Sequence, residues 1–417
     1  MIGRTGRPLC WRRMAALAAL IAVAAALATP VARAADAPPA LLDFSADERQ
    51  RILRHGPWPP PAARDPGNAQ AGQPAAIALG RRLFFDPRLS PDGRLACASC
   101  HAPHLAFADG QARATGREPL DRNTPSLWNA VHGRWYGWDG AFDSLWSQAI
   151  HPLRNPREMA SDAEHLRALV AGDPALRCAY AQAWGAAPRP DAETTLVHLA
   201  KSLGAFVGSL VSGPTPFDAF RDALARGDRR AAARYPQAAQ RGLRLFIGKG
   251  QCSTCHVGPS FSNGEFADIG LPFFVRPGVV DPGRHGGISA LQRSPYNLLG
   301  RHSDAPDGER TALTRHVDLQ HRNFGEFKVP GLRNVADTAP YGHDGQLATL
   351  EAVVDHYSNL NLDRLHADGE QILKPLRLND GERADLVAFL RSLSDPSATR
   401  WRRPAADAAP PRGCGKV

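Results

Sequence analysis

The chain has 417 residues, which is more than one ordinary domain needs, so two or three domains are expected. Its 43% hydrophobic and 22% charged residues are enough to build cores, which excludes wholesale disorder, and it lacks the repeats of collagen-like and mucin-like chains. Five arginines in the acid-free residues 1–34 supply more than half of the formal charge of +9, and no basic run is interleaved with aromatic residues, so nucleic acid is not an expected partner.

The first 34 residues have the pattern of a secretory signal peptide. Arginines up to Arg13 precede an apolar, alanine-rich stretch at 14–28, and Ala32-Arg33-Ala34 then has the small-x-small pattern that a signal peptidase cleaves. The apolar stretch is shorter than the about 20 residues of a membrane-spanning helix, so an uncleaved anchor is the weaker alternative. We therefore expect a periplasmic protein without a membrane span after cleavage.

The rest of the chain divides into an extension, two halves and a tail. Residues 35–75 are predicted to form a Pro-rich N-terminal extension, in which six prolines and three glycines at 56–74 favour an extended course. Two haem domains are predicted at 76–235 and 236–395, for the reasons that follow, and residues 396–417 resemble a loose tail.

Two Cys-x-x-Cys-His motifs indicate the chemistry: Cys97-Ala98-Ser99-Cys100-His101 and Cys252-Ser253-Thr254-Cys255-His256. This spacing lets two thiols bond to the vinyl groups of haem c, while the histidine becomes the proximal iron ligand. A redox dithiol or a shared four-cysteine zinc site are the alternatives, but a dithiol does not need the histidine that both copies have. We therefore expect two covalently bound haem c groups. Outside these motifs and the signal, Cys178 and Cys414 can bridge or stay free.

Matching sequences surround the two motifs. Similar segments precede them at 79–85 and 241–247, and Tyr-Gly-Trp-Asp-Gly at 136–140 is repeated as Tyr-Gly-His-Asp-Gly at 341–345. The offsets before and after the motif differ by 50 residues, which predicts an extra loop at about 262–322 in the second half. Apolar residues elsewhere repeat at helical spacing, as in Leu196, Leu199, Leu203, Phe206 and Leu210. The fold class is therefore mainly α, with two tandem cytochrome c-like haem domains related by internal duplication.

The match between the two halves also indicates how the irons differ on the face opposite the motif histidine, where a sixth ligand can bind. It places Pro152 at the counterpart of Tyr357, and a proline cannot ligate iron, so the first iron is expected to be open. The one methionine after the signal is Met159, in the first half, so the sixth ligand of the second iron is predicted to be Tyr357 or His356. An open iron binds small molecules, whereas a closed one mainly transfers electrons.

With its two haem motifs and the segments around them, the chain resembles the bacterial di-haem cytochrome c peroxidase family, and in particular its MauG-like branch. The resemblance covers about residues 75–395. Besides the haem motifs, it rests on Leu83-Phe84-Phe85-Asp86-Pro87-Arg88-Leu89-Ser90, Arg122-Asn123-Thr124-Pro125, Trp138-Asp139-Gly140, Asn155-Pro156-Arg157-Glu158-Met159, Val329-Pro330-Gly331-Leu332-Arg333-Asn334 and Thr338-Ala339-Pro340-Tyr341-Gly342-His343-Asp344-Gly345.

The resemblance implies a role for several side chains. Gln148 and Glu158 match the pair beside the peroxide on the first haem, and Trp138 matches the aromatic residue between the haems. The family's calcium ion would be held by Asn123, Thr338 and Pro340, whose oxygens suit a hard cation. Residues 105–131 lack the distal histidine of many family members, and Tyr357 stands where ordinary peroxidases have methionine. Both departures favour the MauG-like branch, which needs no reductive activation.

The function expected from the sequence is that of a periplasmic cytochrome-c peroxidase. Hydrogen peroxide would be reduced to water at the open first haem. Electrons from a soluble c-type cytochrome, or from another small periplasmic redox protein, would enter through the second haem. One alternative is MauG-type, peroxide-dependent oxidation of residues in a partner protein. The other is a non-catalytic di-haem electron carrier, which would favour two six-coordinate irons.

Overall fold

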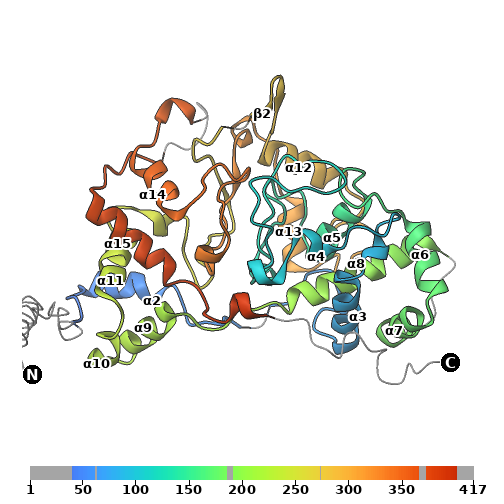
Figure 1. Cartoon of the computed structure of the whole chain (residues 1–417), viewed down its shortest axis with the longest axis horizontal. Helices are drawn as coiled ribbons and strands as arrows, with labels where there is room; N and C mark the ends of the chain where they lie inside the picture. The colour runs from blue at the N-terminus through green and yellow to red at the C-terminus, as the bar shows by residue number, and fades with distance from the viewer. Residues whose placement is uncertain (1–39, 62, 186–190, 273, 366–371, 402–417) are drawn as a thin grey trace, which may run out of the picture. The chain divides into compact units, whose positions relative to one another are not determined.

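The computed structural model describes residues 40–401 except 62, 186–190, 273 and 366–371, and those from 41 onward belong to one compact unit (Figure 1). The predicted signal peptide, Cys414 and the tail beyond residue 401 lie outside the described residues. The fold is mainly helical, as predicted. Among the described residues, none of the helices is long and apolar enough to cross a membrane.

Helices are the main regular elements of both halves, and the strands are short. The helices of the first half are α3 (Pro74–Phe84), α4 (Cys97–Cys100), α5 (Leu145–Arg154), α6 (Ala163–Gly172), α7 (Pro174–Trp184) and α8 (Ala192–Gly208). Further along the chain lie α9 (Pro216–Ala225), α10 (Arg229–Ala232), α11 (Gln237–Ile247), α12 (Arg284–Arg293), α13 (Glu309–Arg315), α14 (Leu350–Ser358) and α15 (Asp380–Arg391). Two antiparallel pairs join β1 (Phe266–Ala267) to β4 (Phe327–Lys328) and β2 (Phe274–Arg276) to β3 (Val279–Val280).

Each half has a helix pair that crosses at a glycine. In the first core α3 packs on α8, and a Cβ atom on Gly80 would lie 1.8 Å from the carbonyl oxygen of Ser202. In the second core α11 packs on α15, and a Cβ on Gly242 would lie 1.9 Å from the carbonyl oxygen of Asp385. Both crossings therefore require glycine, because the obstructing atom belongs to a helix backbone.

Replacing Gly80 with alanine is therefore expected to lower the free energy of unfolding by about 1–3 kcal/mol, since α3 and α8 must separate to admit the methyl group. Thermal unfolding followed by circular dichroism measures this change. Gly172→Ala in α6 is the matched control, because a Cβ there meets nothing within 4 Å. Equal stability of the two variants would contradict the close crossing.

Other local geometries also occur in both halves. Asn129 and Asn334 have φ angles of 64° and 62°, and their backbone N–H groups donate to the carbonyl oxygens of Leu210 and Leu393. An isolated β-bridge follows each asparagine, at Tyr136–Phe142 and at Tyr341–Leu347. These pairs are what a duplication would produce, and the common origin of the halves stays a prediction, as do the domain boundaries.

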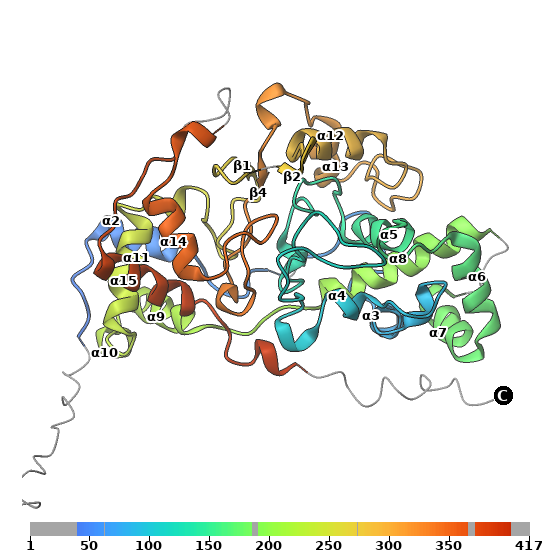
Figure 2. The same cartoon turned by 45° about the horizontal axis from the view of Figure 1, so that its top comes forward.

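The predicted extra loop at 262–322 contains most of the strands and two helices, α12 and α13, which lie beside α5 in both views (Figures 1 and 2). Besides its contacts within the second half, such as the pairing of β1 with β4, it contacts the first half. Arg284 donates to the carbonyl oxygen of Gly140 at 2.8 Å, and Asp281 receives two hydrogen bonds of 2.7 Å from Arg122. The buried Lys201 of α8 pairs with Asp304 at 2.7 Å. The insertion of the second half is thus fixed to the first.

The N-terminal extension is also built into the fold. Helix α2 (Ala46–Leu53) begins with a capping box of Ser45 and Glu48, and Phe44 and Ile52 are buried in the second core. Further on, the carboxylate of Asp65 accepts hydrogen bonds of 2.6 and 3.1 Å from the first backbone N–H groups of α5. The segment 41–73, which we call the strap, therefore contacts both cores.

Candidate haem sites and peroxide pocket

The first haem motif is a single helical turn. Helix α4 carries Cys97 and Cys100, and His101 follows directly as its C-cap. The Nδ1 atom of His101 lies 3.0 Å from the carbonyl oxygen of Phe107, which orients the ring and leaves Nε2 for an iron. Burial lowers the pKa of His101, so the ring is neutral, as an iron ligand has to be.

The second motif repeats this geometry. Cys252 lies in a 3₁₀ turn (Cys252–Thr254) that Cys255 ends, and Nδ1 of His256 lies 3.0 Å from the carbonyl oxygen of Phe261. All four motif cysteines have free thiols, so both pairs are available for thioether bonds to haem. Cys178, by contrast, is disulfide-bonded.

A cavity of ≈ 1270 Å³ lies over the second motif, with Cys252, Cys255, His256 and Tyr357 in its wall. Burial raises the pKa of the Tyr357 hydroxyl, and the charges of Cys252 and Cys255 raise it further. Because charges act at short range, this effect means that the hydroxyl lies near the two cysteines. His356, its neighbour on α14, instead directs Nε2 to the carbonyl oxygen of Ile269 at 2.7 Å. Of the two predicted sixth ligands, Tyr357 is therefore the one that faces the haem motif.

A loop of the first half reaches this cavity. Trp138 and Asn123 line it, and the indole N–H of Trp138 donates to the carbonyl oxygen of Asn123 at 2.9 Å. Thr338 and Pro340 line the same cavity, so all three predicted calcium ligands belong to its wall, and the calcium site itself stays a prediction. The amide nitrogen of Asn123 donates to the carbonyl oxygen of Gln111, which leaves its amide oxygen for a cation.

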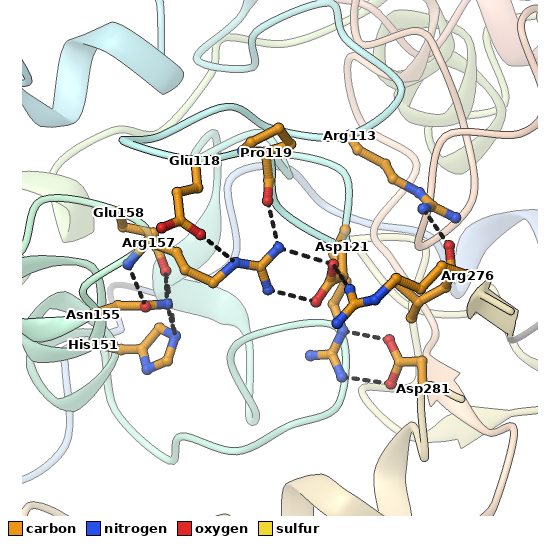
Figure 3. A network of polar contacts seen from close by, with 12 residues as sticks. Arg113, Glu118, Pro119, Asp121, His151, Asn155, Arg157, Glu158, Arg276 and Asp281 are labelled. Carbon is orange, nitrogen blue, oxygen red and sulfur yellow. Dashed lines mark hydrogen bonds and ion pairs between the residues drawn. The ribbon is translucent and has the colours of Figure 1, made fainter. Parts of the chain in front are cut away.

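The predicted distal residues of the first haem come from α5 and the turn after it. Gln148 lies on α5, four residues before Pro152, and its Oε1 is buried without a hydrogen-bond partner among the described residues. The carboxylate of Glu158 accepts a hydrogen bond of 2.8 Å from Asn155 and lies 3.3 Å from Nε2 of His151 (Figure 3). A buried acceptor without a donor is the feature expected where a small polar ligand binds.

Glu158 is both ionised and close to the first motif. Burial acts to raise its pKa, but hydrogen bonds from His151 and Asn155 outweigh burial and lower it below the usual range. Its charge, in addition to burial, helps to raise the pKa of the Cys97 thiol, so the carboxylate lies near the haem motif. The carboxylate is therefore free to accept a proton at neutral pH.

Sequence reasoning missed three residues at these sites. His151 and Glu158 are seven residues apart, across a proline and a turn, so helical periodicity does not connect them. The indole nitrogen of Trp128 is buried without a partner among the described residues and faces the cavity, and Lys328 lines it as well. The one signal for these residues in the sequence was that Trp128 occupies the position that Arg333 has in the second half.

Comparisons with known proteins identify the family of the chain. Residues 74–226 match a family model described as di-haem cytochrome c peroxidase. Methylamine utilization protein MauG of Methylorubrum extorquens is 37% identical over 78% of this chain and 80% of its own length. Cytochrome-c peroxidase IdrP2 of Pseudomonas sp. (strain SCT) is 33% identical over 83% of this chain and 86% of its own length.

Solved structures of similar proteins have the same fold. A MauG-like protein associated with microbial copper homeostasis gives a TM-score of 0.64 at 26% identity, covering 89% of this chain and all of its own. The diheme peroxidase BthA from Burkholderia thailandensis gives 0.63 at 25% identity, covering 80% of this chain and 89% of its own. The chain therefore belongs to the di-haem cytochrome c peroxidase family and is a peroxidase-type oxidoreductase with haem as its cofactor.

Proposed function

We propose that the protein is a periplasmic peroxidase that reduces hydrogen peroxide to water at the first haem. Electrons come from a c-type cytochrome and pass through the second haem. The observation that carries the proposal is the ionised, partly buried Glu158 near the first motif, and the buried Oε1 of Gln148, which lacks a partner among the described residues, supports it. The predicted signal peptide supports the periplasmic location.

Each distal side chain has a distinct role in this proposal. Haem held by Cys97, Cys100 and His101 supplies the iron at which peroxide binds and is reduced. Glu158 takes the proton from the inner peroxide oxygen and returns it to the outer oxygen, which leaves as water. Gln148 orients the peroxide by hydrogen bonding. Two electrons from the donor and two protons from water convert the remaining oxygen to a second water.

The second haem serves electron transfer in this scheme. Cys252 and Cys255 would attach it, and His256 and Tyr357 would supply the protein ligands of its iron, which would serve electron transfer rather than peroxide binding. Trp138, in the cavity wall, carries electrons towards the first haem. A calcium ion on Asn123, Thr338 and Pro340 would hold the loops of the two halves together.

A second candidate function is peroxide-dependent oxidation of residues in a partner protein. It is favoured by Tyr357 in the cavity and by the relative named methylamine utilization protein MauG. A di-haem carrier without catalysis is less well supported, because Pro152 leaves the first iron without a ligand from that position.

Peroxide-dependent oxidation of a reduced monohaem cytochrome c by the fully haem-loaded protein tests the proposal. Rapid turnover without prior reduction is expected, since residues 105–131 contain no histidine that has to leave the first iron. If the haem spectrum changes on adding peroxide while the cytochrome stays reduced, the second candidate replaces the first.

Replacing Tyr357 with phenylalanine is expected to convert the low-spin spectrum of the second haem to a high-spin one, because the hydroxyl that ligates iron is lost. Absorption and electron paramagnetic resonance spectra of the ferric protein measure this change. Tyr341→Phe is the matched control, since Tyr341 also lines the cavity but donates its hydroxyl to the carbonyl oxygen of Val335 at 2.8 Å. A wild-type spectrum for Tyr357→Phe would exclude it as a ligand.

A further inference from the structure

The proposed reaction needs a route for protons. Each turnover consumes two protons from water, and these have to reach the first haem pocket, where the side chain of Glu158 is 23% exposed. A carboxylate that has moved one proton between the peroxide oxygens is ready to receive the next. The residue that reprotonates Glu158 therefore has to contact both the carboxylate and solvent.

His151 meets both conditions. Its side chain is 49% exposed, and its Nε2 lies 3.3 Å from Oε1 of Glu158 (Figure 3). Asn155 lies between them, with its amide nitrogen 2.8 Å from the same oxygen and 3.4 Å from the same ring nitrogen. The ring of Phe142 packs against the imidazole at 5.2 Å. The histidine is thus held between water and the carboxylate.

Of the basic side chains nearby, His151 is the one that can pass a proton to Glu158. Arg157 is directed away, with its guanidinium 2.8 Å from Asp121 and 3.7 Å from Glu118. On the helix of His151, Arg154 donates to the hydroxyl of Tyr296. Arginine does not release its proton in proteins, whereas histidine gains and loses one near neutral pH.

We propose that His151 carries protons from bulk water to Glu158 during peroxide reduction. The inference rests on the proposed function, and His151 acts through Glu158, so it is a positioning and proton-exchange residue. In each turnover the O–O bond breaks with two electrons from the donor. Two protons pass from water to Nε2 of His151, then to Oε1 of Glu158, and finally to the oxygen that remains.

Two substitutions test the route. His151→Ala removes the imidazole, and His151→Gln keeps a hydrogen-bonding side chain that cannot exchange a proton in this way. Both are expected to lower kcat about tenfold or more above pH 7, with little change in KM for peroxide. Raising the phosphate concentration should restore the rate of His151→Ala, because a small buffer acid can replace the imidazole. His316→Ala, at an exposed histidine, is the control.

Cyanide binding to the ferric protein gives a readout without turnover. Hydrogen cyanide has to lose its proton when it binds iron, so His151→Ala should bind it more slowly, and phosphate should restore the rate. Wild-type kcat and cyanide binding in both His151 variants would overturn the relay while leaving the peroxidase proposal intact. Wild-type kcat in Glu158→Gln would instead remove the role of Glu158.

A double variant tests whether the two residues act in series. Adding His151→Ala to Glu158→Gln should change kcat little, because the route is already broken at the carboxylate. Multiplying effects would overturn a route through Glu158. Haem content and circular dichroism of each variant separate these outcomes from misfolding, and His151→Gln serves as the second variant if His151→Ala fails to fold.

Discussion

Replacing Glu158 with glutamine is expected to slow peroxide reduction by about 10²–10⁴-fold, the usual contribution of a positioned acid–base group. The amide keeps the size of the side chain and can still accept the hydrogen bond from Asn155, but it cannot take up and return a proton. Because hydrogen bonds from His151 and Asn155 lower the pKa of Glu158, the carboxylate is ionised at neutral pH. The rate of the wild-type reaction with peroxide should therefore fall in acid, as the carboxylate becomes protonated.

Stopped-flow measurement of the reaction with peroxide, as a function of pH, checks this expectation. Glu164→Gln is the matched control, because Glu164 lies on α6 with a side chain that is 70% exposed and pairs with Arg167 on the same helix. If Glu158→Gln reacts within a few-fold of the control, the acid–base role belongs to another group.

Replacing Arg333 with methionine is expected to lower the free energy of unfolding by about 3–5 kcal/mol, because it leaves a buried charge without its partner. The guanidinium makes two hydrogen bonds of 2.8 Å to Asp218, and the two side chains are 2% and 3% exposed. Arg333 also donates to the carbonyl oxygen of Pro259 and lies over the ring of Trp58.

Urea unfolding followed by circular dichroism measures this loss. Arg391→Met is the control, since Arg391 pairs with Glu351 at the surface, where the side chains are 62% and 54% exposed. An exposed pair contributes about 0–1 kcal/mol, so the two variants should differ clearly. A similar loss in both would mean that Asp218 is accommodated without its arginine.

The haem motifs were predictable because covalent chemistry sets their spacing. The choice between His356 and Tyr357 was not, since neighbours on a helix face different sides and the sequence does not say which side faces the haem. The relation of His151 to Glu158 was hidden for a similar reason. The helix ends at Arg154 and a turn follows from Asn155, so the contact of His151 with Glu158 depends on the fold of the turn.

The fold was least predictable where tertiary packing decides the structure. The segment 262–322 is rich in glycine and proline, and α12 itself contains two glycines, so a loop was expected. In the structure Gly287 lies against the backbone of Asp139, and a Cβ there would be 2.0 Å from its carbonyl oxygen. The glycines of α12 allow it to pack closely on the first half, whereas their low helix propensity alone predicts a loop.

The strap also determines the order in which the chain can assemble. Its first residues have partners nearly 200 positions later, as in the hydrogen bond from Leu42 to Gln240 and the ion pair of Glu48 with Arg244. Closing so long a loop costs entropy before any contact forms, which makes it a late event. Gln240 and Arg244 follow Cys97 and Cys100 in the chain, so in synthesis from the N-terminus the first cysteine pair is complete before the strap can dock. The first motif is therefore made before the last part of the fold can close.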